Sequence, residues 1–148
     1  MFRGSAPTKI DDRGRLKMPA EFRRLLEESF GSNTELFITS TTGESALLYP
    51  LSEWEKVEQR LAAMPSASRA KQRYLETVNY FGQQLRLDAQ GRVVVPQILR
   101  ERAEMVGDVV VSGRLEHLEI WNRERFEEKL RAEPLAEEDF KALADFGI

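Results

Sequence analysis

One short segment occurs twice in this chain, and the repeat limits the possible folds more than any other feature. The first copy runs from Asp11 to Pro19 and the second from Asp88 to Pro96. Matching residues keep one offset of 77 positions: Asp11 and Asp88, Gly14 and Gly91, Arg15 and Arg92, Pro19 and Pro96, Arg23 and Arg100. A match of this kind in residue type and spacing indicates an internal duplication, so we expect two copies of one small structural unit.

Each copy predicts a tight turn between two strands. The Asp carboxylate can accept hydrogen bonds from backbone N–H groups two residues on. The Gly supplies the positive φ that such a turn needs. The Arg follows the turn directly, and the Pro marks the end of a strand and the start of a helix. We expect the Arg to pair with the Asp across the turn, because a guanidinium can brace with some of its five donors and present the others.

Downstream of each predicted helix, the pattern changes to further strands and helices. One hairpin is predicted from Glu35–Thr39 and Ala46–Pro50, and its counterpart from Asp108–Ser112 and His117–Trp121. Ser52 and Glu55 have the spacing of a capping box, which predicts a helix from Ser52 to about Ala63. Further helices are expected over 69–81, from Ile98 to about Met105, over 123–131 with Asn122 as the cap, and within 135–146.

The predicted fold class is α+β, with two tandem β-hairpin, helix and β-hairpin repeats. Units of about fifty residues bury too little surface to be stable alone, so the two should pack together as a pseudo-dimer. We divide the chain into a first unit over 5–51, connecting helices over 52–78, a second unit over 79–123 and a C-terminal helical segment over 124–148.

The residues available for chemistry argue against an enzyme. The chain has no Cys, which excludes disulfides and thiolate sites and indicates a reducing compartment. No set of residues has the spacing of a metal site, a cofactor site or a phosphate loop. The one His, His117, is expected on a strand surface, facing away from Leu118. No apolar run resembles a signal peptide or a membrane span, so a cytoplasmic location is expected.

The charge is unevenly distributed along the chain. The net charge of −3 and the pI near 5.4 argue, taken alone, against a nucleic-acid partner. Residues 1–24, however, hold seven cations against three anions, whereas the residues from Arg125 onward hold four cations against seven anions. A partner meets the local charge, so the N-terminal region is the candidate surface for a polyanion.

Several motifs together resemble the MraZ family of bacterial transcriptional regulators. They are Met1–Gly4, the two Asp-x-x-Gly-Arg turns that lead to Pro, the run from Tyr49 to Trp54, and Glu119–Trp121. The resemblance covers essentially the whole chain and implies AbrB-like swapped-hairpin units in tandem, forming a barrel. It also implies a ring of identical subunits that binds double-stranded DNA at short direct repeats near the division and cell-wall gene cluster, usually as a repressor, and so a place at the nucleoid.

The candidate DNA-binding residues lie mainly in the first copy. We expect Arg15 to read a base edge, with G as the favoured partner of an Arg fork. We expect contacts with phosphates from Arg3, Lys9, Arg13 and Lys17. The second copy has fewer candidate cations, Arg86 and Arg92. Asp11, Gly14, Asp88 and Gly91 shape the turns. We take the first turn as the DNA-facing loop and the second mainly as scaffold. The sequence leaves open whether the Arg92 turn touches DNA or only a neighbouring subunit.

Two other classes of function remain open from the sequence. A protein that only assembles, or binds a protein partner, would use the swapped-hairpin units for oligomerisation and leave the basic turns solvated. A small enzyme acting on RNA is a distant third, since no catalytic constellation is present. Binding measured against salt concentration separates the first two, because a DNA binder shows a negative log–log slope.

Overall fold

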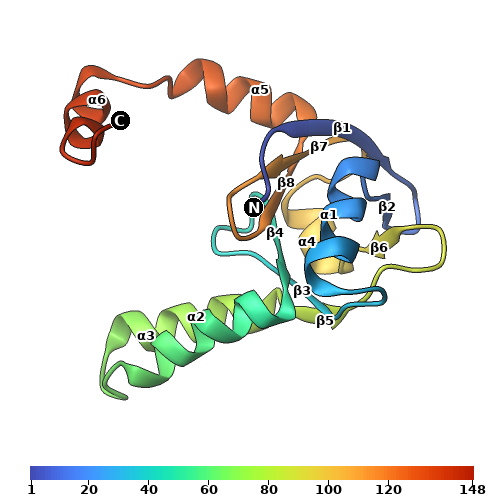
Figure 1. Cartoon of the computed structure of the whole chain (residues 1–148), viewed down its shortest axis with the longest axis horizontal. Helices are drawn as coiled ribbons and strands as arrows, with labels where there is room; N and C mark the ends of the chain where they lie inside the picture. Colours follow the sequence, from blue (N-terminus) through green and yellow to red (C-terminus); the bar gives the residue numbers. More distant parts are fainter.

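All eight strands of the protein form one antiparallel sheet. The computed structural model describes residues 1–148, and the strand order is β5-β3-β4-β8-β7-β1-β2-β6 (Figure 1). The end strands β5 and β6 are connected by the second turn, in which the Asp88 N–H donates to the Arg92 carbonyl at 2.8 Å. The sheet therefore curves into a nearly closed barrel. The strands are β1 (Ser5–Ile10), β2 (Arg15–Lys17), β3 (Leu36–Thr39), β4 (Ala46–Pro50), β5 (Gln83–Leu85), β6 (Arg92–Val94), β7 (Gly107–Gly113) and β8 (Leu118–Asn122).

Six helices accompany the barrel. They are α1 (Ala20–Phe30), α2 (Leu51–Ala63), α3 (Arg69–Tyr80), α4 (Gln97–Arg102), α5 (Arg123–Ala132) and α6 (Glu137–Ala144). Figure 1 shows α1 and α4 beside the strands, whereas α2 and α3 project as one antiparallel arm and α5 and α6 extend as another. None of the six helices combines the length and apolar character that crossing a bilayer requires.

The two repeats exchange strands. We call β1 to β4 with α1 the first unit, and β5 to β8 with α4 the second unit. The strand β1 pairs with β7 of the second unit along its whole length, and β5 pairs with β3 of the first unit. The equivalent strands β2 and β6 pair with each other, as do β4 and β8. The predicted α+β fold of two interlocked units is confirmed.

The core is shared between the units. Twenty buried apolar residues from both repeats form one cluster. Leu16 of β2 and Val93 of β6 lie opposite each other and are both fully buried. Because side chains alternate along a strand, their neighbours on β2 and β6 must point outward. The core thus determines which residues of these two strands face solvent.

Three helices begin directly after a proline. The residues preceding α1, α2 and α4 are Pro19, Pro50 and Pro96, with φ between −54° and −56° and ψ between 137° and 140°. The predicted capping box at Ser52 is wrong, because α2 starts at Leu51 and has no side-chain cap. The φ fixed by Pro50 sets the helix start one residue earlier. The predicted Asn122 cap is confirmed, since its side chain accepts from the Arg125 N–H at 3.0 Å.

Two further expectations needed correction. The strands that flank the second turn do not pair as a ladder, because β5 joins β3 while β6 joins β2. The helix α4 ends at Arg102 rather than near Met105, since Glu104 has a φ of +51°, which ends a right-handed helix. The other predicted hairpins and the remaining helices are present within a few residues of their expected ends. The proposed domain boundaries stay a prediction.

Candidate nucleic-acid interface

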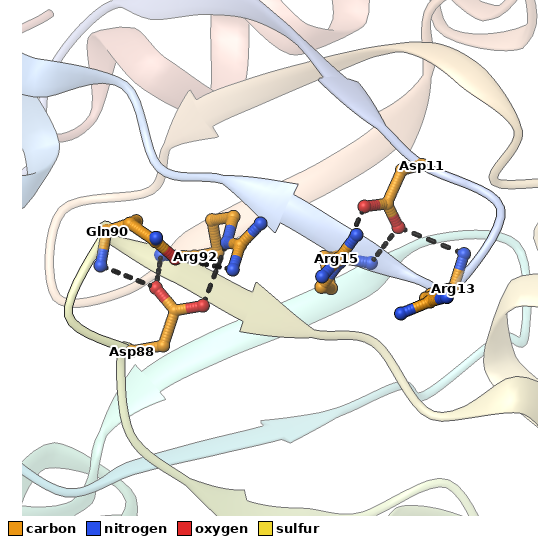
Figure 2. A network of polar contacts seen from close by, with 6 residues as sticks. All are labelled: Asp11, Arg13, Arg15, Asp88, Gln90 and Arg92. Atoms are coloured by element: carbon orange, nitrogen blue, oxygen red, sulfur yellow. Dashed lines mark hydrogen bonds and ion pairs between the residues drawn. The ribbon is translucent and has the colours of Figure 1, made fainter.

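The first turn is organised by the Asp11 carboxylate. One oxygen, Oδ1, accepts from the Arg13 N–H at 3.0 Å and the Arg15 N–H at 2.9 Å, and Oδ2 accepts from Arg15 Nε at 2.7 Å (Figure 2). The Asp11 N–H donates to the Arg15 carbonyl at 3.0 Å, and the Gly14 N–H to the Asp11 carbonyl at 3.0 Å. These bonds fix both the turn and the stem of the Arg15 side chain.

The second turn repeats this geometry. The Asp88 carboxylate accepts from the Gln90 and Arg92 N–H groups, each at 2.9 Å, and from Arg92 Nε at 2.8 Å (Figure 2). Gly14 and Gly91 have φ values of +80° and +75°, which L side chains rarely adopt. The predicted Asp–Arg brace and the predicted positive-φ glycines are therefore confirmed in both copies.

Hydrogen bonding keeps both turn carboxylates charged. The N–H of Arg15 lowers the pKa of Asp11 below its ordinary value of 3.8, against a smaller opposing effect of desolvation, and the Arg15 side chain adds to the lowering. The N–H of Arg92 lowers the pKa of Asp88 in the same way. Both braces are thus intact at neutral pH.

The two arginines differ in the donors that they leave free. One terminal nitrogen of Arg92, Nη2, donates to Gln90 Oε1. The residue equivalent to Gln90 in the first turn is Arg13, whose guanidinium has no acceptor atom. Both terminal nitrogens of Arg15 are consequently without a partner in the chain, and they form a fork that can bind a planar pair of acceptors.

Strand pairing brings the two turns onto one face. In the β2–β6 ladder, Arg15 lies opposite Val94 and Lys17 lies opposite Arg92, with the buried pair Leu16 and Val93 between them. Val94 is 52% exposed, so this face is open to a partner. We call Arg13, Arg15, Lys17 and Arg92 the basic face. The separation into a binding turn and a scaffold turn stays a prediction: the two arginines differ in their free donors, and strand pairing places both on one face.

The other predicted cations lie at different distances from the basic face. Lys9 is an exposed residue of β1, the neighbour of β2, and lies 4.0 Å from Asp108. Arg86 is paired with Glu35 at 2.7 Å, which compensates its charge. Arg3 precedes β1, and a strand rise of about 3.3 Å per residue places it roughly 25 Å from Asp11. Lys9 therefore flanks the basic face, whereas Arg3 and Arg86 do not join it.

His117 belongs to an aromatic contact away from the turns. Its ring stacks on Tyr49, with centroids 4.2 Å apart and planes 10° apart. Burial lowers its pKa, and the Arg114 charge lowers it further, so the imidazole is neutral at neutral pH. The ring is half-buried, and His117 lies just before β8 rather than on a strand as expected.

Comparison with known proteins agrees with this arrangement of duplicated turns. Residues 1–77 and 82–146 match the family described as "MraZ protein, putative antitoxin-like". The chain belongs to the MraZ family. The Transcriptional regulator MraZ of Acidobacterium capsulatum is 52% identical over 148 residues, covering 100% of both chains. The proteins of the same name from Koribacter versatilis and Heliobacterium modesticaldum are 47% and 38% identical, again over 100% of both chains.

Membership of the MraZ family confirms the sequence-based assignment to transcriptional regulators rather than enzymes. Sequence reasoning missed Gln90 as a residue that distinguishes the turns of this MraZ chain. Its signal was present, because Gln90 stands 77 positions after Arg13 and is the one uncharged polar residue that replaces a cation within the repeat. The proximity of Lys17 to Arg92 had no such signal, since it depends on pairing between strands far apart in the sequence.

Proposed function

We propose that the protein is a sequence-specific DNA-binding regulator, acting as a repressor, that recognises short direct repeats upstream of the division and cell-wall gene cluster as a ring-shaped homo-oligomer. The observation that carries the proposal is the Arg15 fork, which Asp11 orients while both terminal nitrogens remain free on an open face. A bidentate Arg pairs best with the O6 and N7 acceptors of G in the major groove.

Contacts with the DNA backbone would come from the cations around Arg15. Arg13 and Lys17 have no acidic partner in the chain and flank the fork, and Lys9 extends the same surface along β1. Cations placed in this way position a protein on DNA without reading sequence. We retain Arg3 and Arg86 as weaker candidates, because Arg3 is distant and Arg86 is neutralised by Glu35.

An acidic protein can bind DNA in this way when several copies act together. Identical subunits in a cyclic head-to-tail arrangement would present the same face to successive direct repeats, whereas a two-fold dimer would suit a palindrome. Linking weak sites raises the effective concentration of each, so one small basic face per subunit suffices. Residence at the nucleoid would follow from this binding.

The alternative is an assembly protein that does not bind DNA. It is favoured by the C-terminal segment, where α6 buries none of its residues and Phe140, Phe146 and Ile148 are exposed. These exposed apolar side chains are the candidate assembly surface under this alternative. A ring that binds DNA needs such a surface too, so oligomer size does not separate the two functions.

Binding of the protein's own upstream DNA tests the proposal. The wild type should bind this fragment more tightly than unrelated DNA, with a negative log–log dependence on salt. Arg15→Ala should remove the preference while leaving the oligomer intact by light scattering. The matched control is Arg60→Ala, which removes an exposed and unpaired Arg from α2, away from the basic face, and should change nothing. Equal binding by Arg15→Ala and the wild type at moderate salt would sink the proposal.

A further inference from the structure

Arg100 of the second unit lies against the turn of the first unit. A Cβ on Gly14 would come within 2.5 Å of Arg100 Nε and 2.6 Å of its Cζ. The guanidinium therefore packs directly on the backbone of Gly14. The positive φ favours glycine, and a Cβ added there would have to displace the Arg100 side chain. The first turn is consequently built from both units.

Two hydrogen bonds to Val95 hold this contact in place. The Val95 N–H, just before α4, donates to the Gly14 carbonyl at 2.9 Å. The Val95 carbonyl in turn accepts from Arg100 Nε at 3.0 Å. Val95, which follows β6, thus binds the turn through its N–H and the arginine through its carbonyl. Val95 therefore links Arg100 and the start of α4 to Gly14.

The second turn has the reciprocal arrangement. A Cβ on Gly91 would come within 2.6 Å of Arg23 Nη1, and the Met18 N–H donates to the Gly91 carbonyl at 2.9 Å. Arg23 belongs to α1 of the first unit, as Arg100 belongs to α4 of the second. Arg23 also pairs with Glu27 at 3.3 Å, whereas Arg100 has no acidic partner. The repeated Arg of each helix therefore packs on the turn of the other unit.

We propose that Arg100 and Arg23 are positioning residues that act across the two units, so that Arg100 orients Arg15 and Arg23 orients Arg92. Arg15 follows Gly14 directly in the chain, and its side chain is hydrogen-bonded within the turn, to Asp11. A displaced Gly14 therefore displaces the Arg15 fork. This inference rests on the proposed DNA binding for its consequence, but the crossing of the units is a property of the free protein.

Hydrogen exchange in the free protein tests, without DNA, whether each of these arginines supports the turn of the other unit. We call this arrangement the crossing. Arg100→Met keeps the length of the side chain and removes the guanidinium, and Arg23→Met is its matched control. Arg100→Met should speed amide exchange in residues 12–16 and leave residues 89–93 unchanged, whereas Arg23→Met should do the reverse. Circular dichroism checks that both variants remain folded. Faster exchange in the turn of the same unit, or no change in either turn, would overturn the crossing.

A double-mutant cycle on DNA tests the positioning role. Arg100→Met should weaken binding to the specific fragment on the order of tenfold, which is within the range of a lost bidentate base contact. In an Arg15→Ala background, measured at low salt where residual binding persists, Arg100→Met should cause no further loss. Arg23→Met should add its own smaller loss in that background. Full additivity for Arg100→Met would mean that Arg100 contacts DNA independently, and no loss in the wild type would mean that it does not position Arg15.

The two outcomes separate this inference from the proposed function. A wild-type protein that ignores the upstream fragment contradicts the proposed function and the positioning role, while the exchange result still decides the crossing. Specific binding that depends on Arg15 but is unaffected by Arg100→Met contradicts the inference alone.

Discussion

The two turns of this chain have the same framework and different chemistry. In both, an Asp carboxylate accepts from two backbone N–H groups and from the Nε of an Arg, beside a glycine of positive φ. The difference that bears on the arginines is at one position, where Arg13 of the first turn corresponds to Gln90 of the second. Gln90 occupies a terminal nitrogen of Arg92, and Arg13 leaves Arg15 free. A duplicated scaffold has therefore kept its shape while only one copy retains a fully free fork.

The charged residues around the two turns also differ, and this difference too favours the first turn as the site for a polyanion. Apart from the Asp–Arg pair that both turns share, the cations near the second turn are paired with acids, Arg23 with Glu27 and Arg86 with Glu35. Around the first turn, Arg13, Lys17 and Arg100 have no acidic partner. Unpaired cations attract phosphate more strongly than paired ones, and on this ground we propose the first turn as the DNA site.

The shared framework should respond equally in the two copies. Gly14→Ala and Gly91→Ala should each destabilise the protein by about 2–3 kcal/mol, because each combines a strained φ with a contact against an arginine. Gly31→Ala should cost about 1 kcal/mol, since Gly31 has a φ of +93° in open space. Urea unfolding measures all three. A large inequality between Gly14→Ala and Gly91→Ala would show that the two scaffolds are not equivalent.

Exchanging the residue types at the Arg13/Gln90 position of the repeat should change binding in opposite directions. Arg13→Gln should lower specific affinity about tenfold, because it removes a cation and supplies an acceptor that engages Arg15. Gln90→Arg should raise affinity by about threefold and steepen the salt dependence, since it frees Arg92 and adds a phosphate contact. Fluorescence anisotropy at several salt concentrations measures both. Two losses of equal size would indicate that the repeat position has no special role.

The repeated pattern was sufficient to predict the local geometry of both turns. The Asp, Gly and Arg spacing gave the hydrogen-bonding pattern and the positive φ correctly, because both depend on residues within five positions. The sequence-based helix start at Ser52 failed because a capping box competes with a preceding proline, and Pro50 fixes the backbone more strongly.

The arrangement across the units could not be predicted from the sequence. The pairing of β1 with β7 and of β5 with β3 joins residues about a hundred and about fifty positions apart, and local propensities carry no signal for it. The contact of Arg100 with Gly14 and the placement of Lys17 opposite Arg92 follow from that pairing. The repeated Arg, at positions 23 and 100, was visible as a pattern in the sequence. Its role depends on the exchange of strands between the two units.

Low pH should lower the stability of the protein through both turns equally, and this is the smallest of the effects predicted here. The pKa of Asp11 and that of Asp88 are lowered in the folded protein, so the contribution of each brace is complete above the ordinary value of 3.8 and is lost as the pH falls below it. Asp11→Asn and Asp88→Asn should each flatten the decline in stability below about pH 4. Thermal unfolding between pH 3 and pH 6 measures this. An unchanged decline in both variants would mean that other carboxyl groups dominate it.

The central claim, that the first turn reads DNA and the second supports it, is tested most directly by comparing Arg15→Ala with Arg92→Ala. Both variants remove the same group from the same framework and leave its glycine and carboxylate in place. Affinity for the upstream fragment is measured for both at the same salt concentrations. Arg15→Ala should lose at least about tenfold more specific affinity than Arg92→Ala, as expected for one bidentate base contact. Equal losses, or a larger loss in Arg92→Ala, would contradict the account.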